Sequence, residues 1–343
     1  MKYIIEEYVL NEYNASSKAR KDVSYFVLQN GFLSLGKNDK TQIRHNKMAK
    51  ALLAFKLFVK IVSLKKEDVL FLQTSELLLK IILKFKKLRG FKVIYLIHDL
   101  FCLAYNESET IALHQKEINR NMALMSQCNC VIAHNSRMID KMKKLGCSAQ
   151  LVSLDIFDYN TTILTPQRYL INGERIKIAF AGNINKSKFL EELDVPHIYD
   201  LIVYGGPSKQ FQTIDYKGCV DPDILPQVIE GHFGLIWEGN YKAMKDNNYN
   251  LLNNPHKLSM YIVAGLPVIA WKDSYAAKFI EQYNIGFGVN SLDEITPKLT
   301  TISIDVYNEY VSNCHNLAVQ LKQGMHIAKA LKKACEVINV NKQ

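Results

Sequence analysis

The chain has 343 residues, too many for one ordinary domain and about right for two of roughly 150 residues each. Apolar residues make up 48% and charged residues 22%, a globular composition that excludes a disordered or low-complexity chain. No uncharged apolar run reaches the roughly 18 residues that a membrane span needs. Glu6 and Glu7 stand where a signal peptide would have its apolar core, so we expect a cytoplasmic protein.

Short β-rich runs alternate with helical stretches, the pattern of doubly wound α/β domains. In the first half, a helix is predicted over 17–30, ended by Gly31, and strands are predicted over 3–10, 32–35, 69–73, 93–97, 130–134 and 150–154. In the second half, strands are predicted over 176–181, 201–204, 213–216, 234–237, 267–271 and 288–289. Helices are predicted there over 222–230, 255–264, 274–283 and 306–322.

These elements predict two Rossmann-like domains, 1–158 and 176–322, joined by an irregular linker over 159–175. A last helix, within 323–343, is predicted to pack back on the first domain. Such sheets bind ligands at the carboxyl ends of their strands. The seven cysteines include no CxxC pair, which favours buried free thiols over a disulfide framework or a zinc site.

The segment from Lys37 to Lys92 holds fifteen Lys or Arg and four Asp or Glu, a surplus of eleven, although the whole chain has a net charge of +10. Large apolar residues alternate with these lysines, and Lys80, Lys84 and Lys87 fall on one helical stripe. A solvated basic face and a helix on an anionic membrane surface both fit this pattern. Nucleic-acid binding fits less well, because arginines are few and no recognition motif surrounds the segment.

Two segments of the second half have the character of anion sites. Gly182 and Asn183 end a strand, and Lys186 follows three residues on, a pattern that also fits a plain strand–turn–helix junction. Asn254 is predicted to cap a helix that begins at Pro255, which places His256 and Lys257 in the first turn. A cation there is unfavourable unless an anion is bound, so we expect a diphosphate site at this helix end.

Two segments of the first half carry ionisable groups. His98 and Asp99 end a buried-looking strand and are candidates for a general base, or for a strand-end histidine beside a capping aspartate. The run Lys18-Ala19-Arg20-Lys21-Asp22 is predicted to turn basic groups toward an anionic ligand, with a solvated helix end as the alternative.

Together, KARKD, LIHD, IAHNSRM, AGNINKSKF, FGLIWEGN and NNPHKLSMYIVAGLPVIAW resemble the bacterial β-1,6-galactofuranosyltransferases of O-antigen synthesis. The chain is similar, less closely, to the glucosyltransferases that extend glycans on serine-rich streptococcal adhesins. The resemblance implies the GT-B fold, with a UDP-sugar donor bound mainly by the second domain and a hexosyl group, galactofuranosyl favoured, moved to a glycan acceptor. It implies a donor-binding role for Lys257 and for Lys186, which stands in place of an arginine, while His256 replaces a tyrosine.

The resemblance further implies inversion at the anomeric carbon without a metal. Asp99 is then the expected base, with His98 beside it and Glu238 in reserve, and the donor-side residues are Gly182, Asn183, Lys186, Asn254, His256, Lys257 and Arg20. Asp221-Pro222-Asp223 is formally a DxD motif, but the following helix pattern favours an N-cap. No cofactor is expected beyond the donor substrate, and a lipid-linked acceptor, an anionic membrane surface and a homo-oligomer are the expected partners. A catalytically inactive nucleotide-sugar-binding subunit is the alternative from another class.

Overall fold

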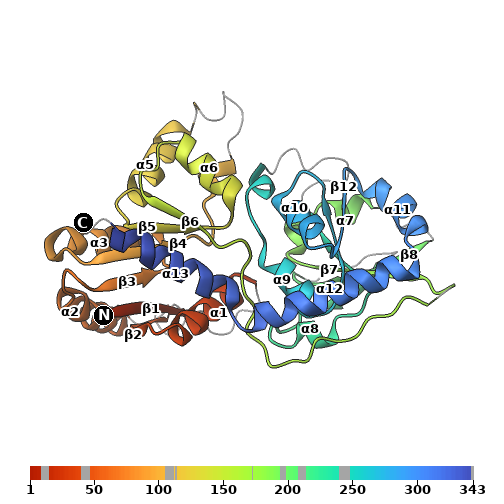
Figure 1. Ribbon diagram of the computed structural model, residues 1–343, viewed down its shortest axis with the longest axis horizontal. Helices are drawn as coiled ribbons and strands as arrows, with labels where there is room; N and C mark the ends of the chain where they lie inside the picture. Colours follow the sequence, from red (N-terminus) through yellow and green to blue (C-terminus); the bar gives the residue numbers. More distant parts are fainter. Residues whose placement is uncertain are drawn as a thin grey trace. The chain divides into compact units, whose positions relative to one another are not determined.

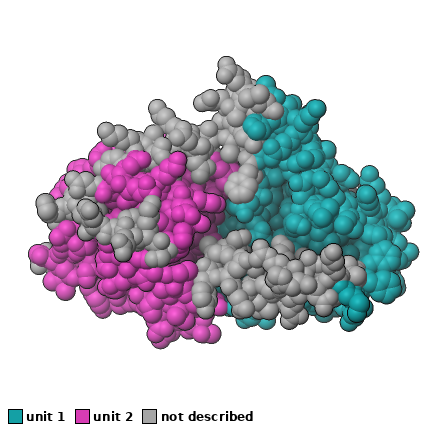
Figure 2. Space-filling model, turned by 180° about the vertical axis from the view of Figure 1, so that it is seen from behind, with its two compact units in different colours: residues 1–160, 324–343 teal, residues 161–323 magenta. Residues whose placement is uncertain are grey.

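The computed structural model describes residues 1–8, 15–39, 47–104, 112, 114–171, 173–193, 198–207, 214–238 and 248–340. The chain divides into two compact units, unit 1 with residues 1–160 and 324–343 and unit 2 with residues 161–323 (Figure 2). Each unit is built on one six-stranded sheet whose neighbouring strands all pair in parallel (Figure 1). The doubly wound α/β class is confirmed.

Unit 1 has the strand order β2-β1-β3-β4-β5-β6. Its strands are β1 (Lys2–Tyr8), β2 (Leu33–Asp39), β3 (Val69–Leu72), β4 (Lys92–Leu96), β5 (Cys130–Ala133) and β6 (Gln150–Ser153). Its α-helices include α1 (Ala15–Gln29), α2 (Lys47–Val62), α3 (Glu76–Arg89), α5 (Gln115–Met125) and α6 (Ser136–Lys144). Strands β3 and β5 are buried along their whole length, as expected for parallel strands covered on both faces.

The last helix, α13 (Met325–Val340), belongs to unit 1 although it follows unit 2 in the chain (Figure 1). Ile327, Leu331 and Ile338 are buried in the same core as strand residues of β5 and β6. The carboxylate of Asp158 accepts hydrogen bonds from the backbone N–H groups of His326 (3.3 Å) and Ile327 (2.6 Å) and so holds the start of this helix.

Unit 2 has the strand order β12-β11-β10-β7-β8-β9. Its strands are β7 (Ile176–Ala181), β8 (Tyr199–Tyr204), β9 (Asp215–Gly218), β10 (Phe233–Ile236), β11 (Val268–Trp271) and β12 (Gly286–Val289). Its α-helices include α7 (Phe189–Glu192), α8 (Leu225–Val228), α9 (His256–Val263), α10 (Tyr275–Gln282), α11 (Ile295–Thr301) and α12 (Ile304–Lys322). The connections reverse direction between β7 and β10, and ligands bind at such a switch point in doubly wound sheets.

The structure corrects some local predictions. The helix expected over 222–230 is only α8, because Asp221 Oδ1 accepts from Asp223 N (2.9 Å) in a turn that precedes it, and Ile229 is extended. The free thiols are not uniformly buried: Cys219 is exposed and Cys335 half-buried, while the other five are buried. The predicted strand over 3–10 runs past Tyr8 into residues outside the described part of the chain.

Within the described residues, no helix combines the length and apolar character that a bilayer span would require.

Candidate functional site

The first candidate site, in unit 2, begins where two adjacent strands end. Gly182 follows β7, and its N–H donates to the carbonyl of Tyr204 at the end of β8 (3.0 Å). Gly205 follows β8 with φ +138°, and a Cβ added to it would stand 1.9 Å from the carbonyl oxygen of Gly182. Only glycine fits at position 205, because both the backbone angle and the space exclude a side chain. The two strand-end turns therefore lie in close contact at the edge of the sheet.

Helix α9 starts beside these turns. Pro255 occupies the N-cap position with φ −68° and ψ 142°, so the helix begins at His256 and not at Pro255. Asn254, predicted to be the cap, lies one residue earlier and is buried. The hydroxyl of Tyr261 accepts a hydrogen bond from Ala181 N (2.7 Å) and donates one to Leu235 O (3.1 Å). These bonds fix α9 against the adjacent strands β7 and β10.

Lys257 carries the positive charge of this site. Its Nζ lies 3.8 Å from Glu238 Oε1 and 5.0 Å from the centroid of the Phe180 ring. Burial lowers the pKa of the Lys257 ammonium, and the Glu238 carboxylate opposes that shift. The helix dipole also disfavours a cation in a first turn. A desolvated cation at a helix N-terminus gains most from a bound anion, so the arrangement suits a diphosphate.

The remaining donor-side residues surround this point. Asn183 Oδ1 accepts from Lys186 N (3.3 Å) and so caps the short 3-10 helix Ile184–Lys186, whose last side chain is exposed. His256 is buried. The structure thus brings Gly182, Lys257 and Glu238 together. Asn183 caps the turn that follows Gly182. Trp237 and Glu238, with Asn250 and Trp271, line a narrow crevice next to Pro255.

The second candidate site is a cavity of about 240 Å³ in unit 1. Gln73 and Thr74, after β3, and His98 and Asp99, after β4, line it together with Arg20 from α1. It therefore lies at the carboxyl ends of strands, next to the point where the order changes between β1 and β3. Three predicted residues, Arg20, His98 and Asp99, meet here.

Hydrogen bonding determines which nitrogen of His98 can act as a base. The amide of Gln73 donates from Nε2 to Arg20 O (3.0 Å) and to Ser24 Oγ (2.8 Å), which leaves its Oε1 as the acceptor. His98 Nε2 lies 2.7 Å from that oxygen and must therefore donate. In the neutral ring the proton is then on Nε2 and the lone pair on Nδ1.

The ring of His98 is held on its other sides by apolar and aromatic groups. It stacks on Phe157 with 5.4 Å between ring centroids. His134, behind it, has Nε2 3.0 Å from His98 O, and burial lowers the pKa of His134 to about 4. His134 therefore stays neutral near pH 7 and acts as a rigid support, whereas Asp99 is exposed at the cavity.

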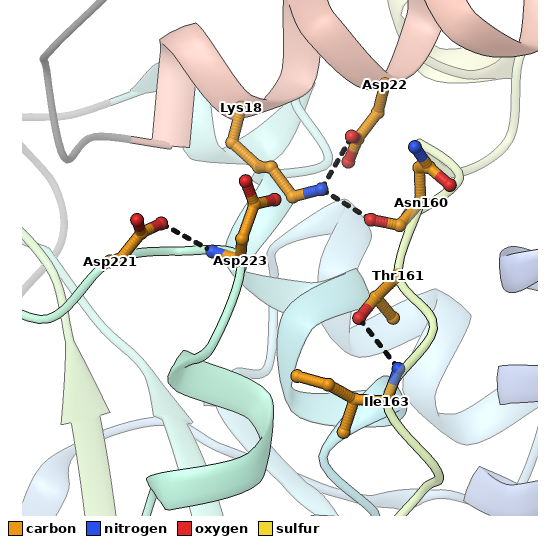
Figure 3. Close-up of polar contacts among 7 residues, drawn as sticks. All are labelled: Lys18, Asp22, Asn160, Thr161, Ile163, Asp221 and Asp223. Carbon is orange, nitrogen blue, oxygen red and sulfur yellow. Dashed lines mark hydrogen bonds and ion pairs between the residues drawn. The ribbon is translucent and has the colours of Figure 1, made fainter.

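The basic run in α1 is divided between two roles. Lys18, expected to face an anionic ligand, is instead buried, with Nζ 2.6 Å from Asp22 Oδ1 and 2.6 Å from the carbonyl oxygen of Asn160 (Figure 3). Its ammonium also lies 4.5 Å from the centroid of the Tyr159 ring. Lys18 therefore fixes the end of the segment that follows β6. Of these two basic residues, only Arg20 lines the cavity.

The DxD-like segment Asp221-Pro222-Asp223 forms a hydrogen-bonded turn. Asp221 receives the N–H of Asp223 through its side chain (Figure 3), as a capping residue does. Among the described residues, no group of three or more His, Cys, Asp or Glu side chains is placed to hold a metal ion.

Models of one protein family match both halves of the chain. The family model "Glucosyltransferase 3-like, N-terminal domain" matches residues 1–156, and "Glucosyltransferase 3-like, C-terminal domain" matches residues 178–334. The chain belongs to the glucosyltransferase 3-like family. The resemblance drawn from the motifs is confirmed.

Two curated relatives cover most of the chain. A β-1,6-galactofuranosyltransferase, WbbI of Escherichia coli K12, is 25% identical over 262 residues, 74% of each chain. Glucosyltransferase 3 of Streptococcus parasanguinis is 26% identical over 251 residues, 71% of this chain and 70% of its own. Both are hexosyl transferases, and the expected enzyme class, a glycosyltransferase, is confirmed.

Solved structures confirm the fold. HepE of Anabaena, solved in complex with UDP and glucose, superposes with a TM-score of 0.62 over 98% of this chain and 99% of its own, at 11% identity. The lipopolysaccharide outer core galactosyltransferase WaaB gives a TM-score of 0.55 over 98% and 99%, at 12% identity. The expected GT-B class is correct.

Two residues that the sequence analysis did not single out help to build the candidate sites. Gln73 sets the tautomer of His98, and Tyr261 positions α9. The only signal for Gln73 was its place after a buried strand, and Tyr261 looked like a core residue of an apolar helix.

Proposed function

We propose that this glycosyltransferase moves a hexosyl group, with galactofuranosyl favoured, from a UDP-sugar to a glycan acceptor in cell-surface polysaccharide synthesis of the O-antigen type. The observation that carries the donor half is Lys257, a desolvated cation in the first turn of α9 beside Gly182 at the switch point of the unit 2 sheet. Solved complexes of relatives in fold with UDP, such as that of HepE, support a nucleotide donor.

The acceptor half of the proposal rests on the unit 1 cavity. Its lining includes Arg20, Gln73, Asp99 and Glu117, groups that both donate and accept hydrogen bonds, as sugar hydroxyls require. The carboxylate of Asp99 or Nδ1 of His98 removes the proton from the acceptor hydroxyl as that oxygen attacks the anomeric carbon. The C–O bond to the diphosphate breaks on the opposite face, which inverts the configuration. Glu238, beside Lys257, is the reserve base.

We further propose that the leaving diphosphate is neutralised by Lys257, Lys186 and helix amides, without a metal. Full transfer in excess chelator is the expected result, and loss of activity that manganese restores would return Asp221 and Asp223 to consideration. Transfer to a lipid-linked acceptor would take place at the inner face of the membrane, in contact with the basic segment 37–92.

A glucosyltransferase that extends protein-linked glycans is the alternative, since a streptococcal glucosyltransferase matches the chain at a similar identity to WbbI. A screen of UDP-sugars by protection against thermal unfolding separates the donors, because a bound ligand raises apparent stability by mass action. UDP-galactofuranose should protect more than UDP-glucose, and the reverse order would favour the alternative. Protection by a donor without turnover in the presence of any acceptor would indicate an inactive binding subunit.

A further inference from the structure

Helix α2 presents a continuous apolar stripe to solvent. Met48, Leu52, Phe55 and Val59 follow each other at intervals of four, three and four residues, which places them on one face of the helix. All four are exposed, by 82, 56, 62 and 51% respectively. The helix contains no acidic residue, and its exposed lysines Lys56 and Lys60 flank the stripe.

Helix α3 has a similar exposed face, in which Lys84 stands among three apolar residues. Leu77, Ile81, Lys84 and Leu88 have the same spacing and are all exposed, opposite the buried face formed by Leu79, Ile82 and Leu83. Lys87 is exposed beside the stripe. Lys80 is held by Glu76 (2.6 Å), which also pairs with Arg120 (3.3 Å), so the acidic residue of α3 is already engaged.

The two helices are neighbours in unit 1. The rings of Phe58 and Phe85 meet edge to face with 5.2 Å between centroids and join α2 to α3. Between Met48 and Val59 a helix rises by about 16 Å, so the two stripes form one apolar surface of nearly that length. Exposed apolar side chains gathered in this way mark an interaction surface.

We propose that α2 and α3 form a docking surface for an anionic lipid bilayer. Phe55, Val59, Leu77 and Leu88 insert among the headgroups, and Lys56, Lys60, Lys84 and Lys87 lie at the level of the lipid phosphates. The combination of a bulky apolar stripe with a lysine margin is that of helices which lie in the plane of a membrane interface. The inference rests on the proposed function, because an enzyme that extends lipid-linked glycans must reach the bilayer.

Charge complementarity favours a lipid surface over a second copy of the chain. In a symmetric dimer built on this surface, the lysines of one copy would face those of the other, and segment 37–92 carries a surplus of eleven positive charges. An anionic bilayer instead attracts each of these lysines.

Sedimentation with vesicles tests this surface with the full chain. Binding should occur to vesicles of phosphatidylcholine with phosphatidylglycerol, weaken as salt is added, and be absent with phosphatidylcholine alone. Phe55→Ser with Leu88→Ser should lower the affinity about tenfold or more through lost apolar insertion. Lys84→Gln with Lys87→Gln should lower it by a similar factor, about tenfold or more, and reduce its salt dependence.

Matched controls use exposed residues elsewhere. Lys143→Gln with Lys144→Gln on α6, and Val319→Ser on α12, should bind vesicles as the parent does. Equal binding to neutral vesicles, or no binding to either kind, would overturn the proposal. A change of mass in light scattering without lipid, caused by Phe55→Ser with Leu88→Ser, would instead identify a surface for self-association and also overturn it. UDP-sugar protection of the same variants reports on the proposed function separately.

Discussion

The two units share one architecture but carry different side chains at the carboxyl ends of their strands. Both candidate sites lie at the carboxyl edge of a parallel sheet beside a change in strand order. In unit 2 the edge offers one partly buried cation, Lys257, beside Gly182, whereas in unit 1 it offers a cavity lined by Arg20 together with neutral and acidic polar groups. A cation at a helix N-terminus suits a diphosphate, and a mixed polar lining suits hydroxyl groups. Under the proposed function, a few strand-end residues specialise the same fold for the leaving group or for the nucleophile.

Gly205→Ala breaks the unit 2 edge alone and has the largest expected effect. The new Cβ would overlap the carbonyl of Gly182 at a backbone angle that favours glycine, so the free energy of unfolding should fall by about 3 kcal/mol or more. Both tryptophans, Trp237 and Trp271, lie in unit 2, so urea unfolding followed by tryptophan fluorescence reports this unit. Gly206→Ala, in the same unit, is the control, because a Cβ added there meets no atom within 4 Å. Equal midpoints for the two variants would contradict the close approach.

Asp99→Asn tests the unit 1 edge. If the carboxylate is the base, turnover should fall by roughly a hundredfold or more, while UDP still protects the protein against thermal unfolding as in the parent. A matched change, Glu117→Gln, keeps the shape of another cavity-lining carboxyl and should cost much less. Should Asp99→Asn turn over normally, His98→Gln and then Glu238→Gln are the next variants to measure.

Lys257→Ala sharpens the donor half of the comparison. Loss of a charge-assisted contact should weaken UDP binding by about 2 kcal/mol, measured by titration calorimetry. Lys188→Ala, a change of an exposed lysine in the same unit, should leave binding unaltered. Lys186→Arg should be tolerated or bind more tightly, because the planar guanidinium can donate two parallel hydrogen bonds to a phosphate. UDP binding by Lys257→Ala equal to that of the parent would refute the site.

Asp158 affects the pH dependence of stability. Burial raises the pKa of this carboxyl to about 7 in the folded chain, above its ordinary value of 3.8. Between these values the folded state holds one proton more than the unfolded state, so stability falls as pH rises from about 4 to 7. Asp158→Asn removes this titration and keeps an acceptor for the N–H of Ile327. The thermal midpoint of the variant should rise relative to that of the parent as pH rises from 5 to 7.5. A difference between the two midpoints that does not change with pH would contradict the raised pKa.

The sequence predicted the sheets far better than the sites. Each of the twelve strands in the described part of the chain was expected within a few residues of its place, because a strand buried in a parallel sheet is a short apolar run between polar turns. The short helices α7 and α11 were missed, since a few residues show no period. Lys18 and Arg20 show a further limit. Two residues apart on a helix they cannot face the same site, but only the packing of α1 decides which one is buried.

The tautomer of His98 was beyond any sequence argument. It depends on Gln73, which is twenty-five residues away in the chain, and on the carbonyl of Arg20, which is further still. Contacts of this kind are created by the strand order, and the strand order is not encoded in any local pattern.

Helix α13 has a consequence for the order in which the chain is made. Unit 1 is translated first, yet the apolar groups of its core that pack on Ile327, Leu331 and Ile338 receive their cover only after the 163 residues of unit 2, 161–323, have left the ribosome. Domains fold as units during synthesis, amino-terminal first where they can. Here the residues of unit 2 are complete before those of unit 1, so a released chain that ends at Gly324 would contain all of unit 2 but leave the core of unit 1 open and prone to aggregation.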